Sequence, residues 1–141
     1  RRFTIIPQLY GRIIKAADGL AADGYDDYYS NFAGGPDCGR FFVQQLPFVG
    51  MVSLFDKELG RFAAVPRIDA RVQIGRGNYL TATANLLSYK DNANSSSISF
   101  ARGYGLEFSR RIAYIGPLKI GLGDSDYTRR LCAYGSVGLS F

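Results

Sequence analysis

Few side chains in this sequence could carry out chemistry. The chain has 141 residues and no histidine, which removes Ser-His-Asp and Cys-His nucleophile systems and every histidine-ligated metal site within it. Residues 134–138 (YGSVG) come close to the Gly-x-Ser-x-Gly nucleophile motif, but Tyr134 replaces the first glycine. The alternating pattern around Ser136 predicts a strand, not the strand-to-helix turn that exposes such a serine. We therefore expect no catalytic residue and no cofactor within this chain.

The acidic residues and the two cysteines offer little more. Two cysteines cannot form a four-cysteine zinc site. Asp23, Asp26 and Asp27 have the carboxylate oxygens that Ca²⁺ prefers, but their spacing fits no complete calcium loop. The Asp-Gly pairs at 18–19 and 23–24 are typical of turns. A solvated acidic loop is the simpler interpretation, and no metal site is expected.

The net charge of +5 does not indicate a nucleic-acid partner. A nucleic-acid binder gathers its lysines and arginines into a stripe interleaved with stacking aromatic residues. Here the basic residues are spread along the chain, whereas acidic residues concentrate between positions 18 and 37. Arginines and lysines that face a polar cavity or anionic lipid headgroups explain this distribution better.

The elements that must position these residues are strands. In residues 68–74 (IDARVQI) apolar and polar side chains alternate, which is typical of a strand with one apolar and one polar face. The opening segment, residues 3–13, alternates less regularly and contains Pro7, which favours an edge strand, a strand end or a bulge. The same alternation recurs over residues 80–86, 103–109, 118–123 and 131–141.

The connections between these strands alternate between short and long. Tight turns are expected at 76–78 and 113–117, and longer polar loops at 91–99 and 123–128. Transmembrane β-barrels have this rhythm of short periplasmic turns and longer external loops, with aromatic residues at strand ends. Tyr79, Tyr89, Tyr114, Tyr127 and Phe141 fall at such ends. A soluble β-sandwich or lipocalin-like barrel stays open, because alternation alone does not tell a lipid-facing side from a core-facing one.

The count of strands leaves one long loop. If Phe141 lies in the periplasm, counting back places the turn at 113–117 on the periplasmic side and residues 15–62 outside. The result is six crossing strands and a loop that contains its own apolar segment, residues 41–51. Because so long a loop without structure is uncommon, we expect it to fold back into the lumen as a plug or constriction, with a short hairpin of its own.

Several segments resemble known outer-membrane proteins. Residues 102–109 (RGYGLEFS), 115–122 (IGPLKIGL) and 134–141 (YGSVGLSF) resemble the final three strands of the BamA-type outer-membrane superfamily, including the IGPL turn and the terminal aromatic residue. Upstream, the chain resembles one branch, the barrel that follows the lipase domain in patatin-like phospholipases of the Bacteroidota. Residues 32–35 (FAGG), 44–50 (QQLPFVG), 67–71 (RIDAR) and 78–80 (NYL) carry this second resemblance.

The resemblance implies an all-β, antiparallel transmembrane barrel of sixteen strands in the bacterial outer membrane. The six strands counted here would be its last six, so that residues 1–141 form a single partial barrel domain. Residues 15–62 would be the loop and residues 63–141 the last five strands. An open edge in lipid is untenable, so other strands must complete the wall. The resemblance also implies that the terminal strand, with Val137, Leu139 and Phe141, is the signal read by the barrel-assembly machinery.

Site residues follow partly from the resemblance and partly from the pattern. In the superfamily an Arg-Gly-Phe loop tip contacts an acidic residue of the inner wall. This chain has Gly39-Arg40-Phe41 there, which implies Arg40 as the tip and Asp69 as its wall partner. The alternation places Arg67, Asp69 and Arg71 on one face, where we expect an ion-pair ladder; a solute-selecting ring is the alternative.

The two cysteines are candidates for a disulfide. Cys38 lies in the long loop, and Cys132 lies on the polar parity of the last strand. The periplasm and the cell surface are oxidising compartments in which disulfides persist. A Cys38–Cys132 disulfide is one expectation and two free thiols are the other.

The resemblance implies that this barrel anchors a patatin-like phospholipase domain, a serine lipid hydrolase, upstream of the chain. Whether the parent is an active enzyme stays open. Two other functions also stay open: the barrel of a BamA-type assembly or translocation factor, and a complete eight-stranded surface barrel. The expected partners are outer-membrane lipids, the barrel-assembly machinery and the remaining barrel strands, with a homo-oligomer or a membrane complex as further options.

Overall fold

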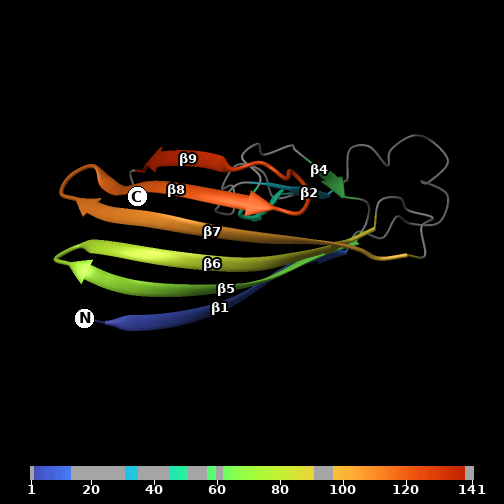
Figure 1. The fold of residues 1–141 in the computed structure, drawn as a ribbon, viewed down its shortest axis with the longest axis horizontal. Coiled ribbons are helices and arrows are strands. Elements are labelled where there is room, and N and C mark those ends of the chain that lie inside the picture. The colour runs from blue at the N-terminus through green and yellow to red at the C-terminus, as the bar shows by residue number, and fades with distance from the viewer. Residues whose placement is uncertain are drawn as a thin grey trace.

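The computed structural model describes residues 2–13, 31–34, 45–50, 57–59, 62–90 and 97–138. Within these residues the chain is all-β, and six antiparallel strands form one open sheet in the order β1-β5-β6-β7-β8-β9 (Figure 1). No helix among them is long and apolar enough to span a membrane. The strands are β1 (Phe3–Ile13), β5 (Phe62–Gly75), β6 (Asn78–Tyr89), β7 (Ser99–Ile112), β8 (Gly116–Ser125) and β9 (Cys132–Val137). The expected all-β antiparallel architecture is confirmed, whereas closure into a sixteen-stranded barrel stays a prediction.

The two ends of the sheet differ in their connections (Figure 1). At one end, the turns at residues 76–77 and 113–115 join β5 to β6 and β7 to β8. Gly77 and Tyr114 there adopt positive φ angles of 72° and 69°, which let the chain reverse within a few residues. At the other end, residues 90–98 and 126–131 connect β6 to β7 and β8 to β9. We call these the turn end and the loop end.

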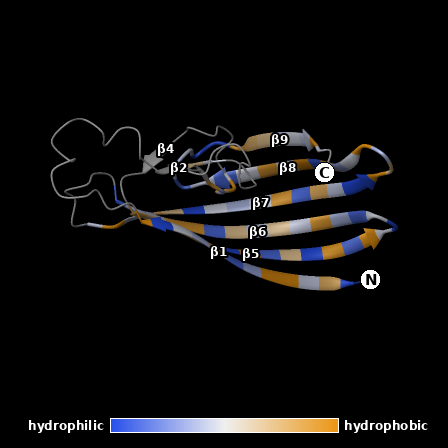
Figure 2. Cartoon of the chain, turned by 180° about the vertical axis from the view of Figure 1, so that it is seen from behind, coloured by the Kyte–Doolittle hydropathy of each residue, from blue (hydrophilic) through white to orange (hydrophobic). Residues whose placement is uncertain are grey.

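The sheet has one apolar and one polar face, and it is the apolar face that is exposed. Large apolar side chains such as Leu9 (76% exposed) and Ile120 (55%) point away from the rest of the chain. On the opposite face Asp69 and Thr81 are only 3% and 2% exposed. This arrangement reverses the usual distribution in a soluble protein, and Figure 2 shows the alternation along each strand as changing colour. The apolar face includes Phe3, Ile5, Leu9, Ile68, Leu106, Ile120 and Leu122, and the polar face includes Asp69, Thr81, Thr83, Asn85, Glu107 and Ser125.

A second, smaller sheet comes from the segment between β1 and β5. Its strands are β2 (Asn31–Ala33), β3 (Gln45–Leu46) and β4 (Lys57–Leu59), in the order β3-β2-β4. β2 pairs in parallel with β3 and antiparallel with β4. The described residues of this loop thus form a mixed three-stranded sheet, and the short hairpin expected in the loop stays a prediction. Parallel neighbours cannot be joined by a tight turn, so a long connection must separate β2 from β3.

An apolar cluster joins the small sheet to the large one near the loop end. Phe48, Val65 and Leu87 are fully buried in it, and Tyr10 packs against it. Val65 and Leu87 lie on the polar face by parity, so this part of the face is locally apolar. Residues 62–66 and 86–87 are apolar at consecutive positions, so apolar side chains lie on both faces of the strand there. This pattern is typical of a strand that is buried on both faces. The other members are Ala33, Leu46, Ala63, Tyr89 and Ala101.

At the far edge of the sheet, an aromatic ring takes the place of a missing side chain. Gly121 in β8 pairs directly with Tyr134 in β9, and a Cβ atom added at Gly121 would overlap the tyrosine ring. The ring lies along the polar face, where the Tyr134 hydroxyl donates a 3.0 Å hydrogen bond to Oε2 of Glu107. The glycine thus allows the tyrosine to reach and satisfy a buried carboxylate.

We predict that Gly121→Ala lowers the free energy of unfolding by about 1–3 kcal/mol, because the added methyl group displaces the Tyr134 ring. The matched control is Gly135→Ala in β9, where an added Cβ would meet only the carbonyl oxygen of Lys119, at 3.8 Å. That change should be neutral or stabilise by up to about 1 kcal/mol. Denaturant unfolding of the folded protein measures both values, and equal losses would contradict the prediction.

Candidate functional site

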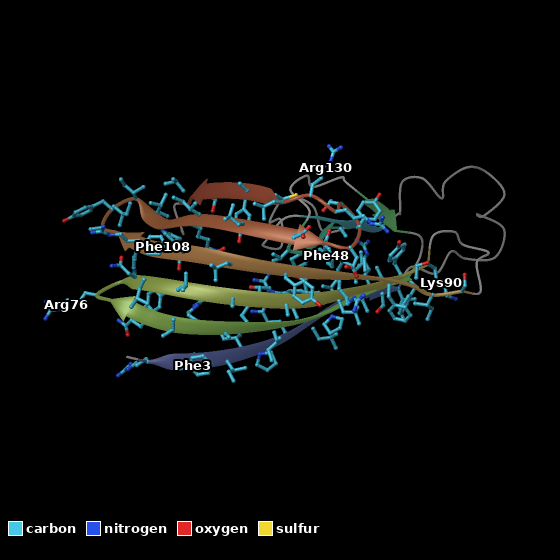
Figure 3. The ribbon with its side chains drawn as sticks, in the orientation of Figure 1. Phe3, Phe48, Arg76, Lys90, Phe108 and Arg130 are labelled. Atoms are coloured by element: carbon cyan, nitrogen blue, oxygen red, sulfur yellow. The ribbon has the colours of Figure 1, made fainter. Side chains whose placement is uncertain are left out.

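Residues 46–50, part of the long loop, lie buried against the polar face of the large sheet. Phe48 is fully buried and Val49 is 2% exposed. Phe48 lies against the sheet toward the loop end (Figure 3). A piece of the chain that the sequence assigns to an insertion thus covers part of the polar face, as expected for a loop that folds back.

Three glycines line the part of the polar face on which this segment lies. Gly103 and Gly105 in β7 and Gly123 in β8 all lie on the polar face. A Cβ atom at Gly103 would overlap the carbonyl oxygen of Val49, and one at Gly105 would overlap the Val49 side chain. A Cβ at Gly123 would come within 2.9 Å of the amide nitrogen of Gly50. Only residues without a side chain allow the segment to approach the sheet backbone this closely.

Asn85 holds the backbone of the segment from one side. The amide of Val49 donates to Oδ1 of Asn85 at 3.0 Å, and Nδ2 of Asn85 donates back to the carbonyl oxygen of Val49 at 3.4 Å. Both hydrogen bonds are buried, and Asn85 is 5% exposed. The side-chain amide therefore satisfies both backbone groups of Val49, which would otherwise be buried without partners.

The carbonyl oxygen of Gly50 is held from the other side. It accepts hydrogen bonds from Thr128 Oγ1 at 3.0 Å and from Ser125 Oγ at 3.2 Å. The sulfur of Cys132 lies 3.6 Å from the same oxygen. We call the residues that hold this segment the seat. They are the three glycines Gly103, Gly105 and Gly123 together with Asn85, Ser125 and Thr128.

The contact of Cys132 with Gly50 bears on the expected disulfide. Cys132 is a free cysteine in the structure, and its pairing with Cys38 stays a prediction. Its sulfur also lies 3.4 Å from the carbonyl oxygen of Arg130, so it interacts with two backbone oxygens. Cys38 lies outside the described residues.

The charged residues expected on the polar face are there, but they divide into two groups. Arg67 forms a bidentate pair with Asp69, with Nε–Oδ1 at 2.8 Å and Nη2–Oδ2 at 3.0 Å, and Thr83 donates to the same carboxylate at 2.8 Å. These bonds satisfy a carboxylate that would be costly to bury alone. Arg71 instead donates to Thr81 Oγ1 at 3.3 Å, and its guanidinium carbon lies 5.9 Å from the centroid of the Tyr79 ring.

These contacts correct one detail of the expected ladder. Both Asp69 oxygens accept hydrogen bonds from Arg67, and Arg71 turns to β6 and an aromatic ring. The reason lies in the pairing of β5 with β6, which puts Thr81 directly opposite Arg71 and Thr83 opposite Asp69. Arg40, the expected loop tip, lies outside the described residues, so its contact with Asp69 stays a prediction.

A second ion pair lies at the loop end on the exposed side. Nε of Arg102 donates to Oδ2 of Asp126 at 2.8 Å, and both side chains are more than half exposed. The hydrogen bond from Arg102 lowers the pKa of the Asp126 carboxyl. Exposed pairs of this kind contribute little to stability, and nothing in their geometry forms a reaction centre.

Of the remaining residues singled out from the sequence, two lie in β9 and the others lie outside the described residues. Ser136 lies in strand β9 and is exposed, and Val137 is 62% exposed on the apolar face. Leu139 and Phe141 lie outside the described residues, as do Asp23, Asp26 and Asp27. Within the described ranges, no group of three or more Cys, Asp or Glu residues could hold a metal ion.

Comparisons with family models, with curated proteins and with solved structures gave no match to this chain. Its function must therefore be inferred from the two faces of the sheet and from the seat.

We predict that Asn85→Ala lowers the free energy of unfolding by about 1–3 kcal/mol, because it leaves the buried amide and carbonyl of Val49 without partners. The control is Asn78→Ala in the same strand, since Oδ1 of Asn78 accepts no hydrogen bond, and its cost should stay below about 0.5 kcal/mol. Hydrogen exchange should show faster exchange of the Val49 amide in the first variant only. Unchanged exchange in Asn85→Ala would contradict the assignment of this contact.

Proposed function

We propose that this chain is a section of the wall of a transmembrane β-barrel in the bacterial outer membrane. Its apolar face would contact lipid, and its polar face would line a lumen that residues 46–50 narrow. The observation that carries the proposal is the reversed distribution of the two faces, with large apolar side chains exposed and charged side chains buried.

The energetics of the apolar face favour a lipid environment. Covering a large apolar side chain that is exposed to water is worth about 1.5–3 kcal/mol, and several on this face are more than half exposed, such as Leu9, Ile5 and Phe3. The exposed ones lie on one face of β1, β5, β7, β8 and β9, which makes a patch much larger than monomeric soluble proteins usually expose. Hydrocarbon chains would cover this patch without any protein partner.

The polar face has the composition of a lumen wall. Its carboxylates are satisfied within the face: Asp69 by Arg67 and Thr83, and Glu107 by Tyr134. A barrel interior of this kind is polar and is plugged by loops in some families. The seat supports the narrowing of the lumen, since it holds the inserted segment by hydrogen bonds to Val49 and Gly50.

The edges of the sheet explain why the wall must extend further. β1 and β9 each pair on one side only within the described residues, and an unpaired strand edge is untenable in hydrocarbon. In the proposed barrel, further strands of the same protein pair with these edges. Pro7, which lacks an amide donor, lies in edge strand β1.

For the whole protein, we propose that the barrel anchors a patatin-like phospholipase domain at the outer membrane after insertion by the barrel-assembly machinery. The support is the sequence resemblance of residues 32–35, 44–50 and 67–71 to that branch. The chain would then act as anchor and wall, and the hydrolase chemistry would belong to a domain upstream.

The lipid-facing assignment predicts that Leu106→Arg, in the middle of β7 on the apolar face, costs about 2–4 kcal/mol in the protein folded into vesicles. Leu131→Arg is the matched control, because Leu131 is more exposed (72% against 49%) and precedes β9 at the loop end. It should cost at most about 1 kcal/mol. Chemical unfolding from vesicles gives both values. A cost of Leu106→Arg below about 0.5 kcal/mol, normal for a solvent-exposed site, would contradict contact with lipid.

The anchoring role predicts that the full-length gene product releases fatty acid from phospholipid vesicles. Absence of ester hydrolysis, together with absence of an upstream Gly-x-Ser-x-Gly segment, would remove the phospholipase assignment and leave the barrel wall standing. Tandem POTRA repeats upstream would favour the assembly-factor alternative, and a signal peptide alone would favour the small surface barrel.

A further inference from the structure

The turn end of the sheet carries a group of exposed arginines. Arg76 projects from the tip of the β5–β6 turn (Figure 3). Arg110 and Arg111 lie near the C-terminal end of β7, and all three arginines are exposed. The register places Arg110 opposite Asn78, and the amide of Arg111 donates to the carbonyl oxygen of Gly77 at 3.1 Å. The backbone therefore brings these three positive charges to one end of neighbouring strands.

The carboxylates of the large sheet lie elsewhere. Between residues 62 and 138 the described acidic residues are four. Asp69 and Glu107 are buried on the polar face and already accept hydrogen bonds from Arg67 and Tyr134. Asp124 and Asp126 lie at the loop end. Within this part of the chain, the positive charge of the turn end has no carboxylate counterpart.

Apolar and aromatic side chains surround these arginines. Tyr114 is fully exposed at the tip of the β7–β8 turn, and Ile115 (47%) and Ile74 (51%) are exposed nearby. Phe108 precedes Arg110 by two residues, so both side chains lie on the apolar face. Arg111 has the opposite parity and lies on the polar side. A cation beside a tyrosine and exposed aliphatic residues is the pattern of a membrane–water interface.

We propose that Arg110, together with Arg76, binds the phosphate group of anionic phospholipids in the leaflet at the turn end. This inference rests on the proposed membrane function. A guanidinium group matches a phosphate with two parallel hydrogen bonds. One arginine near an anionic surface enriches the anionic lipid about fivefold. Arg111 does not take part, because its side chain faces the other side of the sheet.

A local probe can test this site. The chain has no tryptophan, so Phe108→Trp in the full-length protein places a fluorescent reporter on the apolar face next to Arg110. The protein is reconstituted in phosphatidylcholine vesicles that contain a small fraction of brominated phosphatidylglycerol or, separately, brominated phosphatidylcholine. Quenching of the reporter's fluorescence, taken as the difference from the protein without the Phe108→Trp substitution, measures the local fraction of each lipid.

We expect brominated phosphatidylglycerol to be enriched about fivefold over brominated phosphatidylcholine at the reporter. Arg110→Gln combined with Arg76→Gln should reduce this ratio to near one, whereas Arg111→Gln, on the same strand as Arg110 but the opposite face, should leave it unchanged. Equal quenching by the two lipids, or equal effects of the two variants, would overturn the phosphate site while leaving the barrel wall intact. Absence of quenching by either lipid would overturn both, because the apolar face would then not contact acyl chains.

Discussion

The alternation of side chains along an extended strand is the constraint on which the rest of this structure depends. Each strand of the large sheet sends apolar residues to one side and polar residues to the other, and six neighbours in register extend this division across the sheet. The chain itself covers part of the polar side, and the apolar side is left exposed. The proposed contact of this sheet with lipid follows from that exposure.

Burial of a polar face requires that its hydrogen-bonding groups find partners. The structure meets this requirement in two ways. Within the sheet, the carboxylates of Asp69 and Glu107 are bonded to neighbouring side chains. At the seat, Asn85, Ser125 and Thr128 bond to the backbone of an inserted segment, and three glycines allow that backbone to approach. The segment is thus held by hydrogen bonds at Val49 and Gly50 and by the packing of Leu46 and Phe48 in the apolar cluster.

The two ends of the sheet also differ in charge. The loop end combines Arg102 with Asp126 in an ion pair, whereas the described turn end has arginines and no carboxylate. In a bilayer such an asymmetry gives each end a different preference for lipid headgroups. A sheet of this kind would be oriented by its ends and held at its depth by its apolar face.

The sequence by itself determined the local features. Period-two alternation predicted the approximate positions of the strands of the large sheet and the parity of Arg67, Asp69 and Arg71, because these depend on backbone geometry within a few residues. The loop expected at 123–128 begins later, since β8 extends to Ser125. The sequence also contained a signal that simple alternation misses. Leu86 and Leu87 are adjacent and both apolar, which indicates that the polar face is locally apolar and buried at this point.

Only the tertiary structure decided which partners these residues found. The hydrogen bonds of the seat join residues 36 positions apart for Val49 and Asn85, and 78 for Gly50 and Thr128. Gly103, Gly105 and Gly123 look like ordinary strand glycines until another backbone lies on them. Arg71 contacts Thr81 and Tyr79, and Asp69 accepts a hydrogen bond from Thr83, because the register of β5 with β6 selects those neighbours. Local pattern fixes the direction of a side chain, but long-range pairing fixes what it meets.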